Sequence, residues 1–321
     1  MASHFIVAAL AATALLVPGT ALAQAYLTQP LRLVVPTGPG SIADTVTRVI
    51  GNALSQQLSQ PVVVENKVGA NGIIGAEAVA QAAPDGTTLI VGNVSTHAMN
   101  AALYSKLPYD PVRDFAPVSL VGFVPYTLVV GAGVPARNMA ELTALARARP
   151  GKLTYATGSA PSLVTMEMIN RASGIDVLQV GYKTVPQGLT DILAGRIDMM
   201  VADTGAAIPH IRSGKLRALL VATSARSPLL PEVPSLPEVG LPKLDMVGWW
   251  GWFAPAGTPE AAIVRLYEAL AKVTARKDLR EQVAGFGAEL KGGTPAELKA
   301  FTQQQSEMYA RMIKEAGIKP E

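Results

Sequence analysis

Short apolar runs alternate along the chain with amphipathic segments of helical period. The runs predict nine strands, at Leu31–Val35, Pro61–Glu65, Thr87–Val91, Tyr126–Val130, Leu153–Ala156, Val177–Val180, Ile197–Val201, Leu216–Thr223 and Val247–Phe253. The segments between them predict helices at Ala43–Leu58, Ile73–Ala82, Met139–Ala148, Val164–Ala172 and Gln187–Leu193. Alternation on this scale is typical of βαβ units, so we expect an α/β protein with parallel sheets.

Turn and cap residues mark where several elements end. Glycines follow the helical segments at the position where a left-handed residue is favoured. Two further helices are predicted near the C-terminus, beginning at Thr258-Pro259 and at Thr294-Pro295-Ala296-Glu297. The second start has the N-cap, proline and glutamate of a capping box. The proline-rich segment Pro231–Pro242 is predicted to be a loop.

The first 25 residues contain no Lys, Arg, Asp or Glu, and an apolar run extends from Phe5 to Val17. A short apolar run followed by Ala21-x-Ala23 is the pattern of a secretory signal peptide, although the usual basic residue near the start is replaced by His4. We expect cleavage after Ala23 or Ala25 and export of the mature chain. A buried N-terminal helix is the alternative.

The remaining composition narrows the class of protein. Removing 25 of the 321 residues leaves 321 − 25 = 296, enough for two domains. The net charge of +3 is too small to indicate nucleic-acid binding. The chain has no cysteine, which excludes disulfides and thiolate chemistry. We therefore expect a soluble, exported protein of two domains.

The glycine-rich turn after the first strand, LRLVVPTGPGSIAD, raises two possibilities for a ligand. The spacing G-x-G-x-x-A from Gly38, with a second strand ending in Glu65, partly matches a dinucleotide fingerprint. Pro36 and Pro39, however, remove two amide donors that a pyrophosphate would use. A small carboxylate at the first amides of the following helix, from Ser41 onward, is the simpler hypothesis.

A second strand–turn–helix segment has the same character. Its turn carries small and hydroxyl residues at Thr157, Gly158, Ser159 and Ser162. Two helix N-termini, one from each domain, could then face a common cleft. The alternative is that both turns are ordinary capped loops. Asp44 is expected to be the capping-box partner of Ser41, a structural role, since a ligand anion in contact with it would be repelled.

Residues that could carry enzymatic chemistry are few. Beyond the leader the only histidines are His97 and His210, and no nucleophile elbow, zinc-protease motif or P-loop occurs. His97 follows a predicted strand in a polar segment that includes Ser95, where it could line a cleft; a surface or locally hydrogen-bonded histidine is the alternative. An exported hydrolase or a nucleotide-dependent enzyme is retained as the alternative function.

Six blocks spread over the mature chain resemble the Bug family, the extracytoplasmic solute-binding components of tripartite tricarboxylate transporters. They are VVPTGPGSIAD, QPVVVENKVGANGIIGAEAVAQAAPDGTTL, LYSKLPYDPVRDFAPVSLV, GKLRALLVAT, LLPEVPSLPEVGLP and GWWGWFAPAGTP. The resemblance implies a periplasmic two-domain "Venus flytrap" of type II, with two strands that cross between domains. Residues 26–124 and 246–321 would form one domain and residues 125–245 the other.

The resemblance also implies where a ligand carboxylate is held. Two loops would supply amides and hydroxyls, and the block MMVADTGAAIPHI would bring a strand end to the cleft. The expected ligand-binding residues are Thr37, Gly38, Gly40, Ser41, Ser95, His97, Thr157, Gly158, Ser159, Ser162, Asp203 and Thr204. The partners implied are a small carboxylate and the membrane permease subunits; no cofactor, metal or nucleic acid is expected, and the protein should be a monomer.

This chain departs from the family pattern where the ligand would lie. Family members often carry an aromatic residue where this chain has Thr37, and their second loop commonly leads to a histidine that is absent here. Without the aromatic residue, the space between the two loops should be wider, and the loops offer few charged groups to pair with a ligand. These features predict a flat ligand with one buried carboxylate. An aromatic dicarboxylate of the terephthalate type is the first choice, and C4–C6 aliphatic dicarboxylates are the second.

Overall fold

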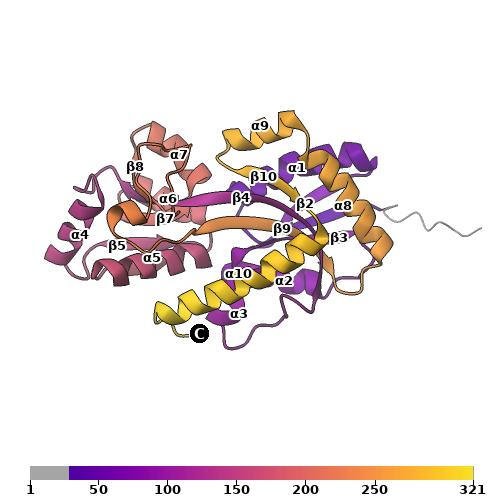
Figure 1. The fold of residues 1–321 in the computed structure, drawn as a ribbon, viewed down its shortest axis with the longest axis horizontal. Helices are drawn as coiled ribbons and strands as arrows, with labels where there is room; N and C mark the ends of the chain where they lie inside the picture. Colours follow the sequence, from indigo (N-terminus) through magenta and orange to yellow (C-terminus); the bar gives the residue numbers. More distant parts are fainter. Residues whose placement is uncertain (1–28, 321) are drawn as a thin grey trace, which may run out of the picture.

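Strand β4 (Phe115–Gly131), 17 residues long, belongs to both halves of the sheet in this computed structural model, which describes residues 29–320. Its first part pairs antiparallel with β9 (Val247–Pro255) and β10 (Glu289–Gly293). Its last part pairs with β7 (Met199–Asp203) and β8 (Leu216–Val221). Figure 1 shows β4 and β9 running side by side between two lobes. One continuous strand therefore links the lobes.

The first lobe is built on the strand order β2-β1-β3-β9-β4. Strand β1 (Leu31–Val35) lies parallel to both β2 (Val62–Asn66) and β3 (Thr88–Asn93). Its helices are α1 (Ile42–Leu58), α2 (Ile73–Ala80), α3 (Asn100–Leu103), α8 (Glu260–Thr274), α9 (Lys277–Gly285) and α10 (Pro295–Glu315), with shorter turns at Ala70–Gly72 and Ser95–Met99.

The second lobe continues the sheet in the order β4-β7-β5-β6. Strand β5 (Thr154–Thr157) lies parallel to β6 (Leu178–Gly181) and to β7. Its helices are α4 (Met139–Ala148), α5 (Ala160–Ser173), α6 (Val185–Leu193) and α7 (Thr204–Arg212). A 3₁₀ turn at Pro237–Val239 lies on the path back to β9, and the Met246 N–H bonds the carbonyl of Ala222 beside β8.

Local capping explains where many of these helices begin. The side chains of Ser41, Asn138, Ser159, Thr184 and Thr294 each accept a hydrogen bond from the backbone N–H three residues later. Each bond satisfies an amide that has no partner within the helix. The predicted capping box at Thr294 and Glu297 is confirmed.

The three tryptophans of β9 show how the core is divided. Trp249 packs in one hydrophobic cluster, which includes residues of β4 and α10, whereas Trp250 and Trp252 belong to another beneath α1 and α8. All three side chains are buried. Successive strand residues point to opposite faces, so β9 contributes to the core on both sides of the sheet.

Eight of the nine predicted strands are present with ends shifted by no more than two residues. The segment predicted at Tyr126–Val130 is only the end of β4, because Pro117 and Gly122 interrupt the apolar run where register shifts occur. Helix α5 begins four residues before the predicted Val164, since Pro161 lies in its first turn instead of breaking it. Strand β10 was not predicted from its glycine-rich sequence.

The two-domain α/β fold is thus present, and its parallel strands lie where the apolar pattern places them. We propose that the domains divide as the sequence predicts, 26–124 with 246–321 and 125–245, since the pairing partners of β4 change at Pro125–Tyr126. Within residues 29–320 no helix combines the length and apolar character needed to cross a membrane. The predicted leader lies outside the described residues.

Candidate functional site

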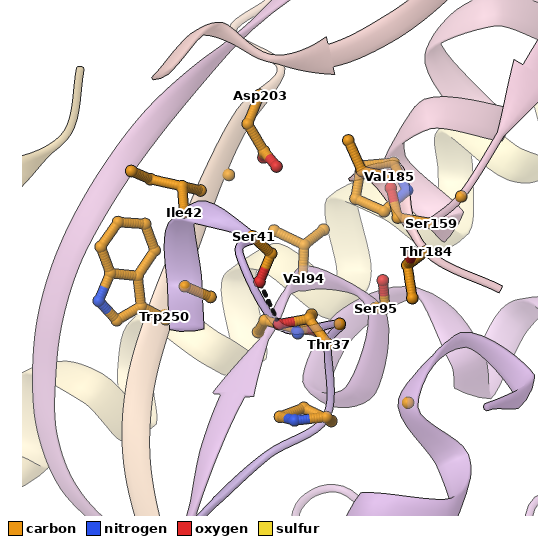
Figure 2. Close-up of a pocket in the computed structure, with 18 of the residues that line it drawn as sticks. Thr37, Ser41, Ile42, Val94, Ser95, Ser159, Thr184, Val185, Asp203 and Trp250 are labelled. Atoms are coloured by element: carbon orange, nitrogen blue, oxygen red, sulfur yellow. Dashed lines mark hydrogen bonds between the residues drawn. The ribbon is translucent and has the colours of Figure 1, made fainter. Parts of the chain in front are cut away.

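A cavity lies between the two lobes and encloses about 690 Å³ of space, part of it open to solvent. Figure 2 shows Thr37 and Ser41 of the first lobe facing Ser159, Thr184 and Asp203 of the second. The remaining lining residues are Pro36, Gly38, Ile42, Ala43, Asn71, Gly72, Asn93, Val94, Ser95, Val124, Tyr126, Gly158, Pro161, Lys183, Val185, Gly248, Trp249 and Trp250. Hydroxyl groups and apolar side chains therefore make up most of its wall.

The loop between β1 and α1 supplies the first-lobe side of the cavity. Ser41 caps α1 by accepting a hydrogen bond from the Asp44 N–H at 3.3 Å. The Thr37 and Ser41 hydroxyls share a hydrogen bond of 2.8 Å. The positive end of the α1 dipole is at this point, so the loop presents hydroxyls and a favourable potential for an anion.

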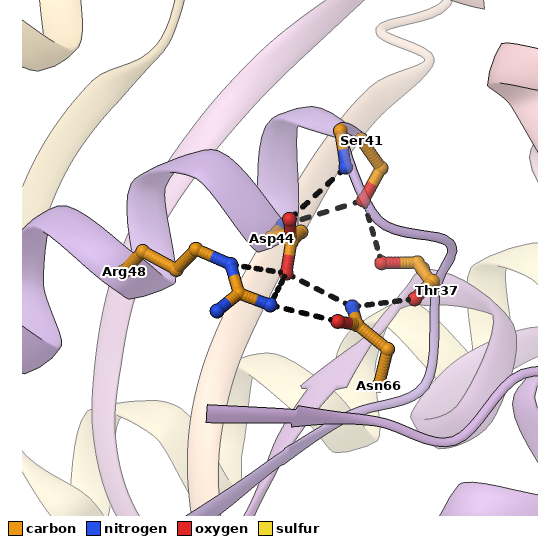
Figure 3. A network of polar contacts seen from close by, with 6 residues as sticks. Thr37, Ser41, Asp44, Arg48 and Asn66 are labelled. Carbon is orange, nitrogen blue, oxygen red and sulfur yellow. Dashed lines mark hydrogen bonds and ion pairs between the residues drawn. The ribbon is translucent and has the colours of Figure 1, made fainter. Parts of the chain in front are cut away.

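A polar network beneath this loop holds its shape (Figure 3). The Asp44 carboxylate accepts hydrogen bonds from the Gly40 N–H at 3.0 Å, from Arg48 Nε at 3.0 Å and from Asn66 Nδ2 at 2.9 Å. Asn66, at the end of β2, also donates to the Thr37 carbonyl at 3.0 Å. The carboxylate faces away from the ligand space and braces the loop.

The charge of Asp44 is stabilised by these contacts. Burial acts to raise the pKa of Asp44, but the hydrogen bonds from Arg48, Gly40 and Asn66 outweigh it and hold the pKa below its ordinary value. Arg48 also forms an ion pair with Asp44 at 2.9 Å. Asp44 therefore has a structural role, but it does not close the predicted capping box: its carboxylate accepts from the Gly40 N–H, whereas the Ser41 N–H bonds the Gly38 carbonyl at 3.1 Å.

The loop between β5 and α5 supplies the second-lobe side. Ser159 caps α5 by accepting a hydrogen bond from the Ser162 N–H at 3.4 Å. Gly158 lies against the start of α6: a Cβ at this position would be 2.5 Å from the Thr184 carbonyl carbon and from the Val185 nitrogen. Only glycine permits this approach, and it brings Thr184 to the cavity wall.

Asp203 and Tyr126 line the cavity from β7 and β4. They are paired directly across the antiparallel ladder, so their side chains lie on the same face. The Asp203 carboxylate points into the cavity in Figure 2. Burial raises the pKa of Asp203 to about 6. Burial also raises the pKa of Tyr126 well above its ordinary value, with smaller contributions from Asp203 and Tyr309.

The cavity brings together seven of the twelve residues predicted to bind a ligand. These are Thr37, Gly38, Ser41, Ser95, Gly158, Ser159 and Asp203. Gly40 lies just outside, with φ of +77° and its N–H directed to Asp44. The other four do not line the cavity.

His97 is a correction to the predicted set. Its ring is fully buried, stacked on Phe253 at a centroid distance of 4.0 Å and close to Phe115 at 4.7 Å. Burial lowers the pKa of His97 to about 3, so the ring is neutral. The polar segment after β3 is not an open loop but a helical turn at Ser95–Met99, and this turn directs His97 into the core of the first lobe.

Three hydroxyl residues are engaged within the protein. The Ser162 hydroxyl donates to the Val201 carbonyl at 2.7 Å. The Thr204 hydroxyl is 2.8 Å from the Pro125 carbonyl and 2.6 Å from the Thr127 hydroxyl. Thr157 is buried, and its hydroxyl accepts from Gln179 Nε2 at 3.2 Å. These contacts hold the strand ends that form the cavity wall.

Several lining residues were not predicted from sequence. Thr184 and Lys183 precede α6, and Thr184 caps this helix by accepting a hydrogen bond from the Gln187 N–H, so its N-cap residue type is the local signal that marks it. The sequence predicts that Tyr126 lies in a strand, but its direct pairing with Asp203 depends on sheet register. Among residues 29–320 no group of three or more His, Asp or Glu side chains could hold a metal ion.

Comparison with known proteins agrees with this architecture. A family model of tripartite tricarboxylate transporter family receptors matches residues 46–318. The chain belongs to this family. The solved structure of the periplasmic binding protein BugD is 31% identical, with a TM-score of 0.88 over 92% of this chain and 100% of that one. The predicted membership of the Bug family is confirmed, and with it the class of periplasmic solute-binding receptors.

Two further family structures were solved with small acids. R. palustris Rpa4515, with adipate, is 30% identical with a TM-score of 0.89 over 92% of this chain and 100% of that one. MatC from Rhodopseudomonas palustris, with bound malate, is 32% identical with a TM-score of 0.85 over 90% of this chain and 100% of that one.

Proposed function

We propose that this receptor captures a small organic carboxylate in the cavity between its lobes. The observation that carries the proposal is the convergence of two capped helix N-termini, α1 at Ser41 and α5 at Ser159, on one cavity. Helix N-termini favour anions through their free amides and their dipoles. Lys183 is the cationic residue that lines the cavity within the described chain, so backbone and hydroxyl groups would do most of the binding.

The cavity favours aliphatic acids of four to six carbons over the aromatic diacid expected first from the sequence. A Cβ at Gly38 would lie 2.5 Å from the Thr184 side chain, so Thr184 occupies space next to the first loop that a wide slot requires. The ligands of the two similar structures, adipate and malate, also belong to the C4–C6 class. We therefore place C4–C6 acids ahead of terephthalate-type ligands.

The cellular context follows from the proposed role. The chain would be exported, lose its leader after Ala23 or Ala25, and act in the periplasm as a monomer that delivers its ligand to the permease subunits of the transporter. The histidine in the first lobe, His97, is enclosed by aromatic rings, which argues against a catalytic constellation there. A binding protein without enzymatic turnover is the function we propose.

A panel of organic acids tests the proposal by thermal shift. A ligand present at 100 times its dissociation constant adds about 2.7 kcal/mol to the free energy of unfolding, so a true ligand raises the melting temperature clearly. We expect shifts with C4–C6 acids, no shift with their methyl esters, and ligand recovered unchanged. Binding of uncharged sugars alone, or conversion of the acid to a product, would contradict the proposal.

A further inference from the structure

We propose that Asp203, with Tyr126 beside it, selects acids that carry a hydrogen-bond donor, an ammonium or a hydroxyl group, over plain diacids of the same length. The inference deepens the proposed function and rests on it, since it concerns the part of the ligand that lies away from the two helix N-termini. The preferred ligands of the receptor would then be amino acids or hydroxy acids.

The placement of Asp203 is set by the sheet and not by a flexible loop. It is the last residue of β7 and pairs with Tyr126 in the antiparallel ladder. Both residues line the cavity, and the Asp203 carboxylate points into it (Figure 2). An acceptor carboxylate and a phenol hydroxyl are thus carried on one rigid wall.

Asp203 differs from the other N-cap residues near the cavity because its side chain does not cap its helix. It occupies the N-cap position of α7, where Asp is among the best capping residues, yet its side chain makes no capping hydrogen bond. Ser41, Ser159 and Thr184 all cap their helices. The carboxylate of Asp203 makes no capping bond to α7 and faces the cavity instead.

No cationic side chain among residues 29–320 forms an ion pair with Asp203. The hydrogen bond that lowers its pKa comes from its own backbone N–H, and burial outweighs it. The other titratable groups that line the cavity are Tyr126, whose pKa is raised in part by the charge of Asp203, and Lys183. A partly buried carboxylate that has, within the described chain, only its own backbone N–H as a donor and no cationic partner is poorly satisfied, so a donor from the ligand would stabilise it.

This arrangement discriminates by charge. A ligand carboxylate placed against Asp203 would be repelled, whereas an ammonium would be attracted and a hydroxyl would donate a hydrogen bond. Near neutral pH, above the pKa of about 6, Asp203 is mostly ionised, so the ammonium should be preferred to the hydroxyl. The second carboxylate of a diacid would then turn toward Lys183 or the cavity mouth.

Matched ligand series on the full mature protein test the inference by calorimetry. Succinate, malate and aspartate share one skeleton, as do glutarate, 2-hydroxyglutarate and glutamate, and adipate, 2-hydroxyadipate and 2-aminoadipate. We expect the wild type to bind the amino or hydroxy member at least tenfold more tightly than the plain diacid in the series that fits. In Asp203→Asn the amino-to-plain ratio should fall to within about threefold. Asp176→Asn, an exposed aspartate of the same lobe, should leave the ratio unchanged.

The outcomes separate this inference from the proposed function. If plain diacids bind as tightly as their amino and hydroxy counterparts, the inference is wrong and carboxylate capture stands. If no acid of any series binds, carboxylate capture falls and the inference falls with it. Should Asp203→Asn not fold, the wild-type ratios still decide, and Tyr126→Phe tests the neighbouring hydroxyl by the loss of hydroxy-acid preference alone.

Discussion

The two loops that face each other across the cavity both join a strand to a helix capped by a serine, but different interactions hold them in place. The first, Pro36–Ser41, is held by a charged network centred on Asp44. The Asp44 carboxylate accepts hydrogen bonds from the Gly40 N–H and from the Asn66 side chain, which also donates to the Thr37 carbonyl. The second, Thr157–Ser162, has only uncharged hydrogen bonds among the described residues and is held mainly by close packing, because Gly158 lies against the backbone at the start of α6.

This difference between the loops predicts which substitutions should destabilise each of them. Electrostatic support depends on pH and on the charge of one carboxylate, and its loss leaves polar groups without partners. Steric support depends on the absence of a side chain, and any added atom must move backbone. The first loop should therefore respond to isosteric changes of charge, and the second to changes of volume.

The largest effect is expected for Gly158→Ala. The added Cβ would lie 2.5 Å from two backbone atoms of Thr184 and Val185, so α6 or the loop must shift. Overpacking of this kind costs about 1–3 kcal/mol, and backbone contact places this variant at about 3 kcal/mol. Denaturant unfolding measures the loss, and ligand affinity should fall as well because Thr184 moves.

Gly181→Ala is the matched control for the volume change. It lies at the end of β6 in the same lobe, and a Cβ there meets no atom within 4 Å. We expect its stability to stay within about 0.5 kcal/mol of wild type, the usual range for surface changes. Equal losses in both glycine variants would show that close packing does not support the second loop.

Asp44→Asn tests the first loop with almost no change in volume. The amide replaces one acceptor oxygen by a donor that faces Arg48, Asn66 or the Gly40 N–H. Hydrogen bonds to charged groups contribute about 1.5–3 kcal/mol each, and since the exposed Arg48 can turn to water we expect a net loss of about 2 kcal/mol at pH 7. Asp176→Asn, exposed in the other lobe, should have little effect.

The pH dependence of this variant has a definite sign. The pKa of Asp44 is lower in the folded than in the unfolded protein, so its contribution is present above the unfolded value of 3.8 and is lost as pH falls through the folded pKa. The gap in unfolding free energy between wild type and Asp44→Asn should therefore narrow below about pH 4. A constant gap from pH 7 to the acid limit would show that the charge is not what braces the loop.

The parts of the fold and site that sequence predicts are those set by neighbours in the chain. Ser41, Ser159 and the Thr294 capping box act on amides three residues away, so their roles are readable from local spacing. The alternating tryptophans of β9 are likewise set by strand period. Strand β10 cannot be predicted in this way, because its glycine-rich sequence has no local strand pattern and is a strand through its pairing with β4.

The parts that sequence does not predict depend on contacts between distant segments. Tyr126 meets Asp203 through the register of β4 and β7, 77 positions apart in the chain (203 − 126 = 77). His97 looked like a cleft residue because it follows polar neighbours, but a helical turn directs it between Phe115 and Phe253. No local pattern distinguishes these two outcomes.

Asn66→Ala should have a smaller effect, confined to the first loop. It removes the bond to the Thr37 carbonyl and one of the bonds to Asp44, while Gly40 and Arg48 still hold that carboxylate. We expect a loss of about 1 kcal/mol in stability and a weaker ligand affinity. Asn66→Asp should be worse, since it places a second carboxylate beside Asp44; if alanine is the more damaging substitution, the network is not electrostatic.

The smallest effect is expected for Thr157→Val, although the sequence suggests that this hydroxyl contacts the ligand. The Thr157 hydroxyl lies outside the cavity lining and accepts a hydrogen bond from the exposed Gln179, whose amide can turn to water when the partner is removed. Valine keeps the volume, so the cost should be below about 1 kcal/mol in both stability and affinity. Ser159→Ala, which removes a helix cap that lines the cavity, should cost about 1 kcal/mol in stability and more in ligand affinity. A tenfold loss of affinity in Thr157→Val would mean that the ligand reaches the Thr157 hydroxyl behind the second loop. Both loops would then hold the ligand through polar contacts that depend on a side chain, and close packing alone would not describe the second loop.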